Sequence, residues 1–139
     1  MVGTYSKSIL LFISLLFWGT SQSAWSQQNI SYPYFEQTLP EIDSTIHLIS
    51  YNKAFVIHFN FCSSTKYCGQ KMVDFIAKTK GDKILIICDN ADAKILEPLR
   101  TQNRFELKQI NQTILTQYGL FSVYNLYIYP QKRKIVKLQ

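Results

Sequence analysis

The stretch that decides the fold is AFVIHFNFCSSTKYCGQKMVDFIAKTKGDKILIIC, residues 54–88. Residues 54–61 are rich in aromatic and β-branched side chains, which predicts a strand ending at Cys62. Successive side chains of a strand point to opposite faces, so we expect Phe55 and Ile57 on one face and Val56 and His58 on the other.

A helix and a second strand follow. Apolar side chains recur at helical spacing between residues 65 and 80, with Ser63, Ser64 or Thr65 as candidate caps and Gly81 as the expected end. Residues 83–88 form a continuous apolar run, which is typical of a strand buried on both faces of a parallel sheet. Together these segments predict a βαβ unit.

The remaining chain predicts five more elements of secondary structure. We expect a helix over 92–103, kinked or restarted at Pro98, and a strand over 105–110. A short helix over 113–118 should stop at Gly119. The last two strands, 125–129 and 134–138, should form an antiparallel hairpin. The fold class is therefore α/β, with a central mixed sheet flanked by helices.

Three segments are expected along the chain. Residues 1–26 read as a secretory signal peptide, because Lys7 precedes an apolar run about half as long as a membrane span. Cleavage after Ser23 or after Ser26 fits equally, and an uncleaved membrane anchor is the alternative. Residues 27–50, with Pro33, Pro40 and no clean period, are expected to be an extended lead-in, although its last part fits a short helix or an edge strand. Residues 51–139 form the expected domain.

Charge narrows the expected partners. The chain has a net charge of +6, but its basic residues are spread out apart from Lys132, Arg133 and Lys134, which we assign to a solvated turn. No basic stripe with interleaved aromatics is present, so nucleic acid is not an expected partner. After signal cleavage we expect no stable membrane insertion and a periplasmic or secreted location.

This order of elements, with a cysteine where the first strand meets the first helix, resembles the thioredoxin-like superfamily, in particular its exported bacterial thiol–disulfide branch. The resemblance covers about residues 53–138 and implies redox activity at Cys62 and Cys68. The chain departs from the family pattern in three ways. Five residues separate the cysteines instead of two, Tyr124 stands near the place of the family's cis-proline, and the final helix is lacking.

Geometry sets a condition on the cysteine pair. Six residues along one helix rise about 9 Å, which exceeds the separation that a disulfide spans. A bond between Cys62 and Cys68 therefore requires the helix to begin after Lys66. In that arrangement Cys62 would be the attacking thiol and Cys68 the resolving one. Cys88, in the buried run, is expected to be a core residue, and its pairing with either other cysteine is the alternative.

No cofactor or metal is expected, because His47 and His58 both precede the cysteines and leave a ligand set incomplete. The predicted function is thiol–disulfide exchange with the thiols or disulfides of other proteins. The alternative is a non-catalytic binding or accessory protein, in which the disulfide is structural and exposed aromatic side chains between Tyr118 and Tyr129 contact a partner. The oligomeric state is left open.

Overall fold

Five strands form one mixed sheet in the computed structural model, which describes residues 30–58 and 68–138. Their order across the sheet is β3-β2-β1-β4-β5. The strands are β1 (Lys53–Val56), β2 (Ile84–Cys88), β3 (Phe105–Gln109), β4 (Asn125–Tyr129) and β5 (Lys134–Leu138).

Strand β1 lies at the centre and joins the two kinds of pairing. It pairs with β2 in parallel and with β4 in antiparallel orientation. Strand β3 extends the parallel side beyond β2, and β5 completes the antiparallel hairpin with β4. The predicted βαβ unit and the predicted terminal hairpin are both confirmed.

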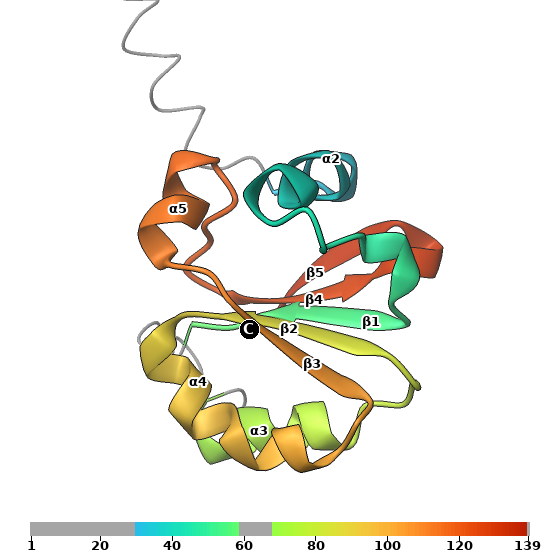
Figure 1. Cartoon of the computed structure of the whole chain (residues 1–139), viewed down its shortest axis with the longest axis vertical. Helices are drawn as coiled ribbons and strands as arrows, with labels where there is room; N and C mark the ends of the chain where they lie inside the picture. Colours follow the sequence, from blue (N-terminus) through green and yellow to red (C-terminus); the bar gives the residue numbers. More distant parts are fainter. Residues whose placement is uncertain (1–29, 59–67, 139) are drawn as a thin grey trace, which may run out of the picture.

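Helices cover both faces of this sheet (Figure 1). One face carries α3 (Gln70–Ala77) and α4 (Asn90–Leu96), which continues directly into the 3-10 helix η4 (Glu97–Thr101). The other face carries α2 (Tyr32–Ile42) and α5 (Gln112–Gln117). The described segments also contain the 3-10 turns η1 (Leu48–Ser50) and η5 (Pro130–Lys132).

Alternation along β1 feeds both hydrophobic cores. Ala54 and Val56 pack with α2 and α5, whereas Phe55 and Ile57 pack with α3 and α4. All five residues of β2 are buried, as predicted for a strand covered on both faces. Each face thus excludes water from its own apolar cluster, which is the main source of stability for a layered fold.

The expected extended lead-in over 27–50 is wrong, because residues 32–42 form the helix α2. Phe35 and Leu39, one helical turn apart, are fully buried in the core on that face. Neither proline prevents this helix. Pro33 lies in its first turn, where its missing N–H is not needed, and Pro40 lies in its last turn. Near its end the lead-in contains the turn η1, and not an edge strand.

Helix α3 is shorter than predicted at both ends. It begins at Gln70 and ends at Ala77, so Gly81 does not cap it. Gly81 instead has φ +143° in the turn before β2, where an added Cβ would lie 2.9 Å from the Cβ of Asn52. The close approach of these two segments, and not the helix end, explains the glycine.

The predictions made for the chain after β2 are confirmed. Pro98 stands in the first turn of η4, so the second turn begins there as one of the two alternatives stated. Gly119 follows α5 with φ +70°, and Lys132, Arg133 and Lys134 are exposed at the hairpin turn. Within residues 30–58 and 68–138, no helix has the length and apolar character that a bilayer crossing requires. The expected signal peptide, 1–26, lies outside the described residues.

Replacing Phe35 with alanine tests whether α2 is part of the domain. Because the ring is fully buried, Phe35→Ala should lower the free energy of unfolding by about 3–5 kcal/mol. Gln37→Ala, an exposed position on the same helix, should change it by less than about 0.5 kcal/mol. Urea denaturation followed by circular dichroism measures both, and equal stability of the two variants would show that α2 does not contribute to the core.

Candidate functional site

Cys68 lies two residues before α3, on the connection that leads from β1 into the helix. Its side chain is disulfide-bonded, and the residue is half-buried. The required start of the helix after Lys66 is confirmed, since α3 begins at Gln70. Cys62 and the predicted loop 63–66 lie outside the described residues.

Gly69 separates Cys68 from the helix and sets the direction of the chain. It occupies the N-cap position with φ +53° and ψ −128°, a conformation that other residues rarely adopt. The predicted caps at Ser63, Ser64 or Thr65 are therefore wrong. Beyond Gly69 the backbone enters the helix at once, and the Cys68 carbonyl accepts a hydrogen bond from the Lys71 N–H at 3.1 Å.

The first turn of α3 supplies partial positive charge beside Cys68. The N–H groups of Lys71 and Met72 donate to the carbonyls of Cys68 and Gly69, just outside the helix, and no side chain caps this turn. No acidic residue stands in that turn to offset the charge. A thiolate at this position would be stabilised, since the same effect lowers cysteine pKa values at helix N-termini.

Cys88 is a core residue, as predicted. It is fully buried, carries a free thiol and belongs to the cluster under α3 and α4. The alternative in which it pairs with another cysteine is therefore wrong. Burial raises its pKa to about 12, and the carboxylates of Asp92 and Asp89 act in the same direction. The thiol is thus both inaccessible and protonated near neutral pH.

His58 lies two residues after β1 and is also buried. Its ring lies 5.3 Å from that of Phe121, and burial lowers its pKa while Asp89 opposes the shift. His47 is exposed in a different segment. Within residues 30–58 and 68–138, no three His, Cys, Asp or Glu side chains are placed to hold a metal ion.

Asn125 connects this region to β4. Its side-chain oxygen accepts a hydrogen bond of 2.7 Å from the His58 N–H, so the end of β1 and the start of β4 are held together. Just before it, the Tyr124 N–H donates to the Ser122 hydroxyl at 3.2 Å. The described residues contain no cis peptide bond, so the chain at Tyr124 is trans. Sequence reasoning missed Asn125, whose only signal was a polar residue opening an apolar strand.

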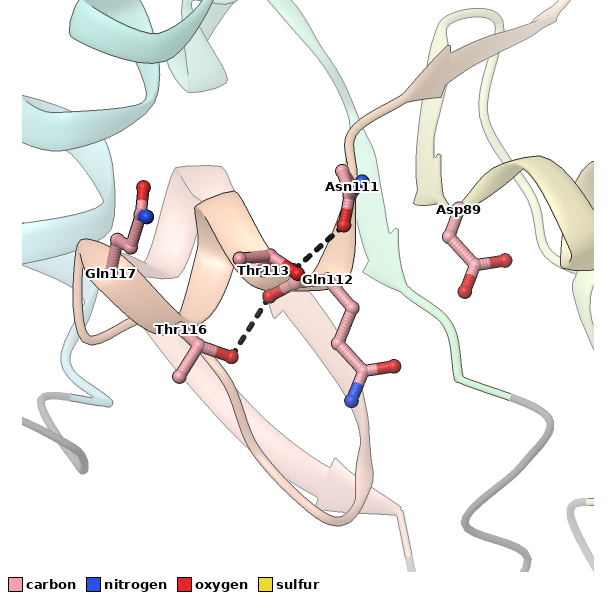
Figure 2. A pocket seen from close by; sticks show the side chains of 6 residues that line it. All are labelled: Asp89, Asn111, Gln112, Thr113, Thr116 and Gln117. Carbon is pink, nitrogen blue, oxygen red and sulfur yellow. Dashed lines mark hydrogen bonds between the residues drawn. The ribbon is translucent and has the colours of Figure 1, made fainter.

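An open pocket of about 540 Å³ lies beyond the carboxyl ends of β2 and β3 (Figure 2). Asp89, at the start of α4, faces the α5 segment across it. This is where the chain leaves β2 toward one face of the sheet and leaves β3 toward the other, which is the usual ligand position in open α/β sheets. The lining residues are Asp89, Asn111, Gln112, Thr113, Thr116 and Gln117.

The pocket offers hydrogen bonds more than acid–base chemistry. The side chains of Asp89 and Asn111 cap their own helices, accepting from the N–H groups of Asp92 at 2.9 Å and Thr113 at 2.8 Å. The Thr116 hydroxyl donates to the Gln112 carbonyl. Amides and hydroxyls remain as the principal polar groups, and no sequence motif predicted their grouping.

Gly69→Ala tests how strongly the backbone beside Cys68 is constrained. The added Cβ meets no atom within 4 Å, so the cost comes from the positive φ alone. We expect a loss of about 1–3 kcal/mol in the free energy of unfolding. Gln70→Ala, at the next and exposed position, should change it by less than about 0.5 kcal/mol. Guanidinium denaturation of both variants measures this free energy. A loss in Gly69→Ala no larger than in Gln70→Ala would show that the backbone at Gly69 is not constrained.

The comparisons with known proteins add no assignment. No protein-family model matches the chain, and neither a curated protein nor a solved structure matches it significantly.

Proposed function

We propose that this protein exchanges thiols and disulfides with other proteins through Cys62 and Cys68, on a thioredoxin-like fold. The observation that carries the proposal is the disulfide-bonded Cys68 two residues before the helix of the central βαβ unit. Cysteines at a strand-to-helix connection, next to a helix N-terminus, are in the environment that makes thiols reactive.

We assign Cys62 as the partner of Cys68 by elimination. The chain has three cysteines, and Cys88 is free, so Cys62 is the partner that remains within one chain. Both cysteines belong to the connection between β1 and α3, so their bond closes a short loop of the backbone.

The proposed reaction moves two electrons without a cofactor. In the reduced protein the Cys62 thiolate attacks a substrate disulfide, forms a mixed disulfide and releases one substrate sulfur as a thiolate. The Cys68 thiolate then attacks the Cys62 sulfur of that mixed disulfide. The second substrate sulfur leaves, and the bond between Cys62 and Cys68 forms. The substrate is reduced and the protein is oxidised, and the reverse sequence oxidises a dithiol substrate.

The surroundings of Cys68 favour a disulfide that can be opened. Partial positive charge at the start of α3 stabilises a Cys68 thiolate and hence the reduced protein. Stabilising the reduced form raises the reduction potential. The buried Cys88, with its raised pKa, does not take part in exchange.

Sheet topology supports the thioredoxin-like part of the proposal. A central strand with a parallel βαβ partner on one side and an antiparallel hairpin on the other is the arrangement that the resemblance implies. We further propose that residues 1–26 direct export, since an oxidising compartment allows disulfides to persist.

A non-catalytic accessory protein is the second candidate. The trans backbone at Tyr124 favours it, because the family's cis-proline shapes the groove that receives the substrate. The aromatic surface expected between Tyr118 and Tyr129 is only partly exposed. Tyr127 is buried, and Tyr118, Tyr124 and Tyr129 are half-buried. The large apolar side chain that is most open in this region belongs to Val123, with 51% exposed.

The reduction potential separates the two candidates. A pair that cycles should have a potential above about −300 mV, and a purely structural bond a lower one. The protein should also accelerate insulin reduction by dithiothreitol, and Cys62→Ser should abolish this. Cys88→Ser is the matched control and should retain full activity if it folds. An inactive wild type, or unchanged activity in Cys62→Ser, would leave only the accessory role.

Counting thiols tests the pairing separately. Without reductant, the native protein should react with a thiol reagent at no cysteine, because Cys88 is buried and protonated. In guanidinium, one thiol per chain should react, and mass spectrometry should place the label on Cys88. Three reactive thiols in the unfolded protein would contradict the disulfide.

A further inference from the structure

Six lysines gather at the end of the sheet where the parallel strands begin, and we call this surface the lysine edge. Five of them are exposed, and Lys53 is half-buried. They come from the start of β1, the connection from α3 to β2, the hairpin turn and the start of β5. The members are Lys53, Lys78, Lys80, Lys83, Lys132 and Lys134.

Hydrogen bonds hold these separate segments side by side. The Asn52 side-chain oxygen accepts from the N–H groups of Asp82 and Lys83, both at 2.9 Å. The Gln131 amide donates to the Tyr51 carbonyl at 3.0 Å, which ties the hairpin turn to the same place. Figure 1 shows this turn at the same end of the sheet as the starts of β1, β2 and β3.

The lysine edge is not neutralised by its neighbours. None of its six side chains forms a salt bridge with another residue of the described segments. In contrast, the nearby Arg133 is paired with Glu36 at 3.2 Å. Lys108 is paired with the carboxylates of Glu106 and Asp43. Asp82 is the single acidic residue in the segments that supply the lysines.

We infer that the lysine edge docks the protein on an anionic lipid bilayer. Lysine carries a hydrated point charge on a flexible stem, which suits a diffuse layer of headgroups, whereas arginine is the usual choice for fixed phosphates of nucleic acid. The aromatic rings beneath these lysines are not open for base stacking, since Tyr51 is buried and Tyr129 is covered on its faces. Tyr129 stacks on Tyr127 with ring centroids 4.4 Å apart, and Lys53 and Lys132 lie over it at 4.7 and 5.5 Å.

This contact would orient the molecule. Cys68 follows the carboxyl end of β1, whereas the lysine edge lies where β1 begins. Docking therefore turns the disulfide end away from the lipid and toward proteins in the surrounding solution. Binding is expected to be electrostatic and reversible, with no element entering the hydrocarbon.

Vesicle co-sedimentation of the full chain tests the inference. Vesicles of phosphatidylglycerol and phosphatidylcholine should bind the protein, and pure phosphatidylcholine vesicles should not. Each lysine near an anionic surface contributes roughly a fivefold gain in partitioning. The variant Lys83→Gln/Lys132→Gln should thus bind about 25-fold more weakly, and salt should weaken the wild type because it screens the charges.

Lys71→Gln/Lys94→Gln is the matched control, since both lysines are exposed on α3 and α4 and the same net charge is removed. It should bind within about threefold of the wild type, and thermal melting should show that both variants fold. Equal losses in the two variants would reduce the effect to overall charge and overturn the inference. Equal binding to both vesicle types would assign the contact to the apolar N-terminal run, and preferential binding to duplex DNA over anionic vesicles would assign the surface to nucleic acid; either result overturns it.

Discussion

Everything in this fold depends on the position of β1 between a parallel and an antiparallel neighbour. All four of its residues pair with β2, and Ala54, Phe55 and Val56 also pair with β4. Its side chains alternate between the two cores, so the strand cannot slip by one residue without exchanging every contact. The connection carrying Cys68 leaves from the end of this strand. The place of the candidate site in space is thus set by the central strand of the sheet.

Patterns within single segments made most of the fold predictable. The apolar run of β2, the alternation of β1 and the glycine after α5 each indicate their structure without reference to the rest of the chain. Helix α2 was missed because two prolines and a few polar residues conceal a short apolar face. Phe35 and Leu39 become informative only when the sheet offers a surface to cover, and that surface is built from residues far along the chain.

Near the candidate site, the earliest start of the helix was predictable from the sequence, and the surroundings of Cys68 were less so. The condition that the helix begin after Lys66 followed from helix rise alone, and α3 satisfies it. The exact start depends on Gly69, whose positive φ no local pattern revealed. The hydrogen bond between Asn125 and His58 joins residues 67 positions apart, so it depends on the pairing of β1 with β4.

The complete burial of Cys88 also bears on how the chain acquires its disulfide. A chain with three thiols can form three different pairs, and two of them would use Cys88. Once β2 is enclosed between the two layers of helices, its thiol no longer competes for an oxidant or for the other sulfurs. Packing of the central strands thus withdraws one thiol of the three from oxidation and leaves the other two cysteines to pair with each other.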